Sequence, residues 1–434
     1  MRKFKGFKNN FIKLSSFQIL VRFRRGLFYS FLSIYLRFYL NLSVTETTLF
    51  ATFPMIINIL FQNFIWGALS DKLQKRRTFI ILGEILAAVG TILTWYFHTL
   101  QPDKHLAGYV IIIGLTIIEI FWSMSNLGWT AILSDLYKPT KLAEIRGKLA
   151  SMGGVGRIIG VLIGGIAYDG LGNYYRGWGF SEGVLFFIAA GMMLLSCIPI
   201  IFLPEGGITE DDKKSWNKQK NRSRERSISR LFWLFIISMV FINFGRNSIA
   251  TIKSQFFSLE DGLNLNPQML SYIVNMRSVA MILFGAITGL LLKKLKEEWL
   301  LFVSSVVGAI HLLIFILANS VPIAFFANFI GGGAQVLIFA SSYSVVNYMI
   351  PPRKRGRKFA IYNATLFLSW GVAGTLIAGP VADYLLSEGF APLTAYRGSF
   401  WTGVCLSTIG LALLLIFISQ FTKFHRFDDK NFRI

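Results

Sequence analysis

The stretch GALSDKLQKRR, residues 67–77, is a short polar connector between two long apolar segments. FATFPMIINILFQNFIW precedes it and TFIILGEILAAVGTILTWYF follows it. The connector sets Asp71 among four bases, in a chain that is 54% hydrophobic and only 15% charged. An apolar run of about 20 residues can cross the roughly 30 Å hydrocarbon core of a bilayer as a helix. The connector is therefore predicted to be a loop at a membrane surface.

Similar apolar runs recur along all 434 residues, and the mean hydropathy is +0.55. The runs are continuous and do not alternate, which excludes a transmembrane β-barrel. The sequence predicts an all-α polytopic membrane protein with twelve transmembrane helices. We expect the spans near 17–38, 48–70, 77–98, 106–134, 148–169, 183–203, 231–256, 267–291, 298–318, 321–349, 358–386 and 398–420.

The start of the chain is basic and leads into the first apolar run. That run contains Arg22, Arg24 and Arg25, and no small-residue cleavage site follows it. A removed signal peptide has a purely apolar centre and such a cleavage site. The segment is therefore predicted to be an uncleaved first membrane helix.

The basic residues are concentrated on one side of the predicted membrane. The formal net charge is +22, and 36 of the 44 Lys and Arg fall in the two terminal segments and in alternate connectors. This distribution follows the positive-inside rule and predicts cytoplasmic termini in a plasma membrane. Seven scattered loops do not form the concentrated patch that nucleic-acid binding needs, so the basic residues are expected to contact lipid headgroups.

Other classes of chemistry find no support in the residue pattern. Cys197 and Cys405 each lie within a span, and the four histidines lack the spacing of metal ligands. The phosphate-binding sequence of ATPases and a catalytic constellation are both missing from the sequence. We expect neither an enzyme nor a cofactor-binding protein.

The polar stretch after residue 204 divides the spans six and six. It predicts an N-terminal bundle over 1–204 with a short cytoplasmic tail, a cytoplasmic linker over 205–230, a C-terminal bundle over 231–421 and a cytoplasmic tail over 422–434. The halves resemble each other, because Arg25 and Arg246 occupy corresponding places near the start of each. Internal duplication of helical bundles is common in secondary transporters.

The connector itself resembles a motif of the major facilitator superfamily, which follows the second helix and reads roughly G-x-L-x-D-R/K-x-G-R-R/K-R/K. The matching residues include Gly67, Asp71, Lys72, Arg76 and Arg77. The sequence departs from the motif at Gln74, where Gly is usual, and at Lys75. The resemblance covers the whole chain and implies two pseudo-symmetric six-helix bundles that rock around a site near the midplane.

In that family the motif latches one half to the other on the cytoplasmic face. Gly67 lacks a Cβ, so we expect a neighbouring helix to approach it closely. Asp71 lies beside four bases and can accept charge-assisted hydrogen bonds. A simpler alternative, in which the bases only set topology, explains Lys75 but neither Asp71 nor Gly67.

The fifth span contains GRIIGVLIGG, with Gly156, Gly160 and Gly164 repeating every four residues and Gly165 adjacent. These glycines are predicted to line one helix face for close packing. They also resemble the fifth-helix motif of antiporters of the family, although Val161 replaces its proline, which leaves open whether the chain exchanges or exports its solute.

Charged groups at membrane depth are costly and usually face a cavity or a partner. Candidate residues for the substrate or proton pathway are Glu119, Arg25, Arg246, Arg277 and Arg157, joined by the polar residues Gln335, Tyr343 and Asn347 of the tenth span. Structural roles are expected for the others: Arg22 and Arg24 reach the headgroups, Glu84 pairs with a nearby Arg, and His311 packs.

Four further features have predicted roles. Phe121 and Trp122 either pack or stack on a solute, residues 331–333 allow the tenth helix to bend, and Asp169 and Asp383 gate or cap their helices.

The predicted function is secondary active transport of a small organic solute by alternating access. A proton or another ion drives it, with Glu119 as the proton-carrying candidate, and we expect a monomer in the lipid bilayer. The candidate arginines outnumber Glu119 and Glu84, which favours an anionic solute. The alternatives are a drug efflux antiporter, a non-transporting receptor or scaffold, and a lipid flippase on the same fold.

Overall fold

The computed structural model describes the backbone of residues 2–137, 139–206, 222–349 and 355–431. It describes the side chains of residues 10–70, 72–133, 135–137, 145–206, 229–349, 358 and 361–423. The described backbone is helical apart from short connections and contains no strand. The predicted all-α class is confirmed.

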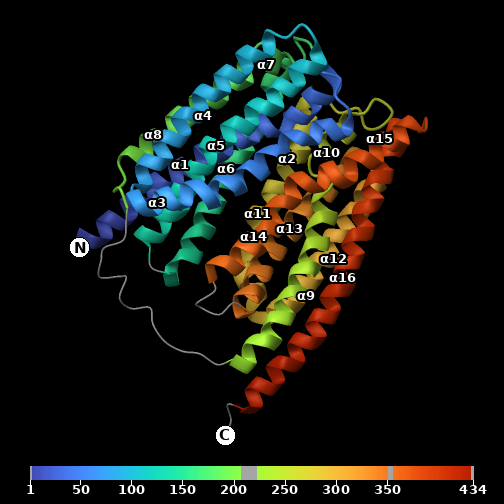
Figure 1. The fold of residues 1–434 in the computed structure, drawn as a ribbon. Coiled ribbons are helices and arrows are strands. Elements are labelled where there is room, and N and C mark those ends of the chain that lie inside the picture. Colours follow the sequence, from blue (N-terminus) through green and yellow to red (C-terminus); the bar gives the residue numbers. More distant parts are fainter. Residues whose placement is uncertain (1, 138, 207–221, 350–354, 432–434) are drawn as a thin grey trace. The chain divides into compact units, whose positions relative to one another are not determined.

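The N-terminal part of the chain forms long helices joined by short turns (Figure 1). Its elements are α1 Arg2–Ile34, η1 Tyr35–Tyr39, α2 Val44–Phe61, η2 Gln62–Trp66, α3 Gly67–Leu73, α4 Arg76–Thr99, α5 Lys104–Leu136, α6 Pro139–Asp169, α7 Trp178–Ser181 and α8 Val184–Ile201.

The C-terminal part has the same character. Its elements are α9 Arg222–Asn247, α10 Lys253–Ser258, α11 Pro267–Lys294, α12 Glu297–Ile316, α13 Val321–Met349, α14 Arg355–Ala373, η5 Gly374–Ala378, α15 Gly379–Ser387 and α16 Pro392–Asn431.

The chain divides into two compact units. One consists of Met1–Trp216 with Ile252–Ser278, and the other of Asn217–Thr251 with Val279–Ile434. The segment Ile252–Ser278, which includes α10 and the first part of α11, thus packs with the N-terminal helices. The domain boundaries predicted from the linker divide the sequence into its two related halves. These boundaries stay a prediction.

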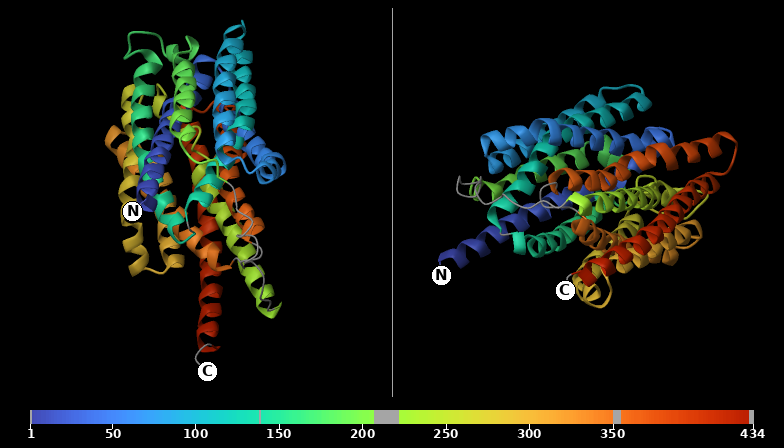
Figure 2. Two further views of the ribbon diagram at one scale, coloured as in Figure 1. Left: turned by 90° about the vertical axis from the view of Figure 1, so that its left-hand side faces the viewer. Right: turned by 60° about the horizontal axis from the view of Figure 1, so that its bottom comes forward.

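The helices pair in the same way in both units, which is the signature of a duplicated bundle. In the first unit α1 packs on α6 and α8, and α4 packs on α5 and α8. In the second unit the equivalent helices repeat this, since α9 packs on α14 and α16, and α12 on α13 and α16. The long neighbours α4 and α5, and likewise α9 and α16, run side by side in both views of Figure 2.

Eleven described helical segments are long and apolar enough to cross a membrane. They coincide with the second to twelfth predicted spans, and the chain is a multi-pass membrane protein. The first predicted span lies in α1 and η1, and its arginines lower its apolar character. It is nevertheless an integral helix of its unit, because Leu27, Phe31 and Leu32 are fully buried.

Four spans differ from the predicted continuous helices. The first ends in the π-helix η1, and the eleventh passes from α14 through the π-helix η5 into α15. The second passes from α2 through the wide π-turn η2 into α3. The seventh ends at Asn247, well before the predicted residue 256, and the chain resumes as the short helix α10 after an irregular turn. Lys253, near the end of that predicted span, is buried at the start of α10. The predicted linker region 207–221 lies outside the described residues.

Candidate functional site

The connector of residues 67–77 turns sharply at Gln74, one of the two positions where it departs from the family motif. Gln74 ends α3 in the left-handed conformation, with φ 53° and ψ 25°. Only glycine adopts this conformation without steric cost. The motif position that usually carries Gly thus has the backbone geometry that requires it, and Gln74 is held there under strain.

Two bases of the connector join helix ends within the first unit. Arg76 is buried, donates to the Ser70 carbonyl at 2.5 Å and forms an ion pair with Asp135 of α5 at 3.6 Å. Arg77 pairs with Glu205 at 3.0 Å and donates to the Leu203 carbonyl at the same distance. The connector therefore ties α4 to the ends of α5 and α8.

Glu205 also caps the first turn of α4. Its carboxylate accepts the Thr78 backbone N–H at 3.0 Å, and its carbonyl accepts the Arg77 backbone N–H at 3.1 Å. A carboxylate at a helix N-terminus satisfies free N–H groups and complements the helix dipole. The chain leaving α8 is thereby anchored to α4.

Gly67 lies at the junction of the π-turn η2 and α3. Within the part of the chain that the structure describes, an added Cβ would meet only the Gln62 carbonyl, at 3.0 Å, in the preceding π-turn. The glycine thus accommodates the turn of its own helix, and the approach of a helix from the other half stays a prediction. The side chain of Asp71 lies outside the described residues, Lys72 is exposed, and the latch stays a prediction.

The glycines of α6 face α1. A Cβ added to Gly156, Gly160 or Gly164 would lie 2.0–2.6 Å from a backbone carbonyl oxygen of α1. At Gly165 it would lie 2.9 Å from the Pro267 carbonyl oxygen of α11. This is the close packing that the four-residue spacing predicts, and α6 runs without a break through Val161.

A buried ion pair joins α1 to α4. Arg24 Nη1 and Glu84 Oε2 are 2.8 Å apart, and each side chain is 3% exposed. Ser125 of α5 donates to the other Glu84 oxygen at 2.8 Å. The expectation that Glu84 pairs with an Arg is confirmed. The expectation that Arg24 reaches the headgroups is wrong, because a carboxylate inside the bundle satisfies its charge.

Glu119 of α5 interacts electrostatically with both members of this pair. It is 5% exposed, and its Oε1 accepts a hydrogen bond from the Asn58 amide of α2. Arg25 of α1 interacts with it electrostatically without forming a direct ion pair in the described side chains. We refer to Arg25, Tyr29, Asn58, Glu119 and Trp122 as the α1–α5 cluster.

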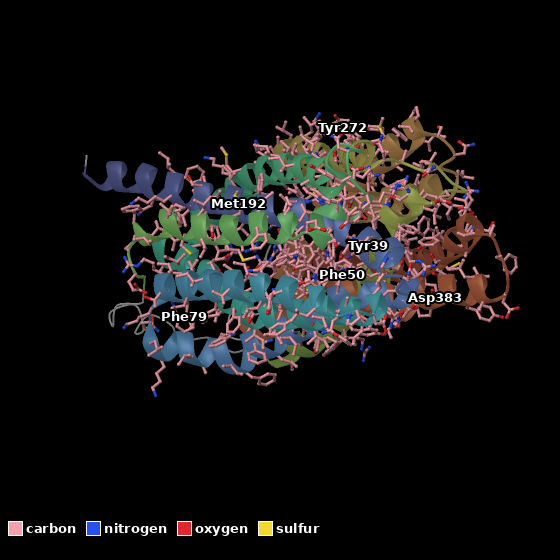
Figure 3. All side chains as sticks on the ribbon, turned by 90° about the horizontal axis from the view of Figure 1, so that it is seen from above. Tyr39, Phe50, Phe79, Met192, Tyr272 and Asp383 are labelled. Carbon is pink, nitrogen blue, oxygen red and sulfur yellow. The ribbon has the colours of Figure 1, made fainter. Side chains whose placement is uncertain are left out.

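Aromatic rings surround this cluster. Trp122 is buried, the Arg24 guanidinium lies 4.1 Å from the centroid of its ring, and the Tyr29 ring lies 6.3 Å away. Tyr29 also stacks on Phe50 of α2, which Figure 3 labels, with centroids 6.1 Å apart. Trp122 thus has the packing role proposed for it, and its face is occupied by a cation.

Arg157 lies on α6 and Arg277 on α11. Arg157 of α6 donates to Ser278 of α11 at 2.8 Å, and Arg277 is half-buried on α11. Both act electrostatically on the buried Lys253, so three bases share this region of the first unit. Nearby, Asp169 caps the turn after α6 through the Gly172 N–H and accepts the Gln268 amide at 3.1 Å.

Arg246 lies in the second unit, in a polar face formed by α9 and α14. It is 8% exposed and donates to the Asn243 side-chain oxygen at 3.2 and 3.4 Å. Asn243 contacts Thr365 at 3.4 Å, and Asn247 donates to Ser369 at 2.8 Å. Among the side chains that the structure describes, no carboxylate pairs with Arg246.

The three candidate residues of the tenth span have different environments in the structure. Tyr343 donates to Asn363 of α14, Gln335 is half-buried, and Asn347 is exposed. Residues 331–333 belong to the continuous helix α13, and the predicted bend of this helix stays a prediction. A Cβ at Gly331 would lie 2.7 Å from the His311 ring, so this glycine serves packing against α12.

Several site residues were missed by the sequence interpretation. Asn58 stood in an apolar span with no recognised motif, and Asn243, Asn247, Thr365 and Ser369 are short polar residues. Their signal was periodicity, since Asn243, Arg246 and Asn247 fall on one helix face. Tyr362, Thr365 and Ser369 repeat at intervals of three and four residues in the same way.

A family model described as Major Facilitator Superfamily matches residues 14–259 and again 235–424. The chain belongs to this superfamily, and the two matches correspond to its two halves. A comparison with curated proteins gives no match.

Solved transporters share the fold at low identity. A bacterial homologue of the human lysosomal transporter Spinster, inward-facing and unoccupied, is 15% identical with a TM-score of 0.66, covering 96% of this chain and 98% of that one. A mutant of the nucleoside transporter NupG is 13% identical with a TM-score of 0.73, covering 95% and 100%. The peptide transporter POT with sulfate is 13% identical with a TM-score of 0.70, covering 96% and 95%.

The family and the fold define a multi-pass membrane protein of the transporter class, which is not an enzyme class.

Proposed function

We propose that this chain is a proton-coupled secondary active transporter of a small organic solute that carries an anionic group, and that it works by alternating access. The matched family and the transporters that share the fold support the general class. Two features of the chain support the finer assignment, namely the environment of Arg246 and that of Glu119.

The environment of Arg246 carries the anionic preference. Its guanidinium is buried in the second unit and is held by a neutral amide, with no carboxylate partner among the described side chains. A buried guanidinium without a counter-charge is costly, so a partner from outside the chain is favoured. Carboxylate and phosphate groups can accept two parallel hydrogen bonds from Arg.

Glu119 is the proposed proton carrier. It is an acid buried within a span, and acids in this setting commonly belong to proton relays. Its described hydrogen-bond partner is the neutral Asn58 amide, unlike Glu84, whose charge is fixed by Arg24. Compared with Glu84, Glu119 is therefore the acid whose charge is free to change during a transport cycle.

The anionic preference is tested by binding. Purified protein is screened against carboxylates, phosphates, sugars, nucleosides and lipophilic cations, and Arg246→Gln and Arg246→Lys are compared for any ligand found. Arg246→Gln should weaken the binding of an anion by about 2–4 kcal/mol, and Arg246→Lys should lose less of this binding energy. Tight binding of a hydrophobic cation, unchanged in both variants and with no anion bound, would instead favour drug efflux.

The proton role is tested in proteoliposomes. Glu119→Gln should abolish accumulation driven by a pH gradient and leave exchange of labelled solute measurable, because exchange needs no net proton release. Glu388→Gln, an exposed acid, is the matched control. Uptake by Glu119→Gln with the wild-type response to pH would remove Glu119 from the mechanism.

The oligomeric state, membrane and orientation predicted from the sequence are part of this function. The chain acts as a monomer in the plasma membrane with both termini cytoplasmic, and the connector of residues 67–77 gates its cytoplasmic face. The bias of Lys and Arg between alternate connectors supports this orientation.

A further inference from the structure

The α1–α5 cluster contains several polar groups whose hydrogen-bonding capacity is not used. The Trp122 indole N–H is buried and has no acceptor in the part of the chain that the structure describes. Arg25 forms no ion pair or hydrogen bond there either, and the second oxygen of Glu119 accepts none. Trp122 is buried, and a buried N–H is normally satisfied, so its lack of an acceptor needs an explanation. Arg25 is half-buried and can accept a partner from outside the chain.

These groups belong to one site and not to scattered positions. Trp122 follows Glu119 by one turn of α5, and Tyr29 follows Arg25 by one turn of α1. Tyr29 interacts electrostatically with both Glu119 and Arg25, and its ring lies 6.3 Å from that of Trp122. The unmatched groups therefore face a common region between α1 and α5.

The ion pair beside the cluster does not use these groups. Glu84 accepts from both Arg24 and Ser125, so its two oxygens are already engaged. Arg24 in turn covers the Trp122 face. This leaves Arg25 and Glu119 as one positive and one negative group that no side chain fully satisfies within the described residues.

The unmatched groups define a complementary ligand. Arg25 and the Trp122 N–H can donate hydrogen bonds to a ligand, whereas the second Glu119 oxygen can accept one or pair with a cation. Tyr29 and Phe50 stack on each other and Arg24 covers one face of Trp122, so the remaining apolar surface of these rings lies next to these polar atoms. A ligand that satisfies all of them has an acidic group, a basic group and a flat apolar body.

We propose that the α1–α5 cluster binds a zwitterionic solute of the aromatic amino-acid type. Its carboxylate pairs with Arg25 and accepts from Trp122, its ammonium pairs with Glu119, and its ring packs against Tyr29 and Phe50. This inference deepens the proposed function and rests on it for the claim that the bound solute is transported.

The test compares ligands that lack one group each. L-phenylalanine is titrated into the full-length protein alongside 3-phenylpropanoate, 2-phenylethylamine and L-alanine, which lack the ammonium, the carboxylate and the ring. Each missing charged group should weaken binding by about ten- to a hundredfold. L-tryptophan and L-histidine extend the series to other flat rings.

Variants then assign each group of the ligand to its partner. Glu119→Gln should weaken the binding of L-phenylalanine by about tenfold or more and leave the affinity for 3-phenylpropanoate unchanged. Arg25→Gln should weaken the binding of 3-phenylpropanoate and leave the affinity for 2-phenylethylamine unchanged. Trp122→Phe keeps a ring and removes the N–H, so a loss of about three- to tenfold is expected. Glu388→Gln and Arg176→Gln, both exposed, are the matched controls.

The outcomes separate this inference from the proposed function. The zwitterion site is overturned if none of the three aromatic amino acids binds. It is also overturned if L-phenylalanine binds no more tightly than 3-phenylpropanoate, both to the wild type and to Glu119→Gln. Either result leaves transport of another solute intact. Binding with the expected pattern but no exchange in proteoliposomes sustains the site and refutes transport. If a variant does not fold, the ligand series on the wild-type protein decides alone.

Discussion

Replacing Glu84 by Gln should destabilise the first unit strongly, because it strands a buried charge. Arg24 and Glu84 are 2.8 Å apart and each is only 3% exposed, so water cannot replace the lost carboxylate. Removing one partner of a buried pair costs about 3–5 kcal/mol. The stacking of Arg24 on Trp122, worth about 0.5–2 kcal/mol, exists in both proteins and offsets none of this loss.

The double variant Arg24→Met with Glu84→Leu tests the cause. It removes both charges and fills a similar volume, so its stability should lie within about 1–2 kcal/mol of the wild type or exceed it. Thermal unfolding in detergent, followed by loss of the monomeric protein peak, should show a fall of roughly 6–20 °C for Glu84→Gln and little change for the double variant. Glu388→Gln controls for loss of an exposed acid.

The reasoning would be refuted if Glu84→Gln were as stable as the wild type, or if the double variant were no more stable than Glu84→Gln. Either result would mean that the charge of Arg24 reaches water or another acceptor after the substitution. The headgroup position that the sequence predicts for Arg24 would then be its preferred position.

Three further substitutions address the connector and α6. Gln74→Gly should stabilise the protein by roughly 0.5–1 kcal/mol, because φ is 53° there, and a lower unfolding temperature would contradict this. Gly160→Ala should destabilise by about 1–3 kcal/mol, since its Cβ would lie 2.0 Å from the Phe23 carbonyl, whereas Gly147→Ala, whose Cβ meets nothing within 4 Å, should not. Asp71→Asn should leave expression intact and slow transport about tenfold, and transport at the wild-type rate would exclude the latch.

The sequence alone determined the class of the molecule and the course of its chain. Continuous apolar runs can only be accommodated as membrane helices, because every backbone polar group in a bilayer must be satisfied within its own segment. The distribution of basic residues and the duplicated pattern around Arg25 and Arg246 then indicated two related bundles. The four-residue repeat of glycines in the fifth span indicated the helix face that packs closely, although not the helix against which it packs.

The tertiary structure decided which polar groups satisfy one another. Arg24 and Glu84 are 60 positions apart, and Asn58 and Glu119 are 61 apart. A single sequence shows that each of these groups needs a partner, but many helices could supply one. Only the packing of α1, α2, α4 and α5 brings Glu84 to Arg24 and leaves Glu119 with an amide. The free energy of a buried charge depends on its nearest neighbours, and chain order does not specify those neighbours.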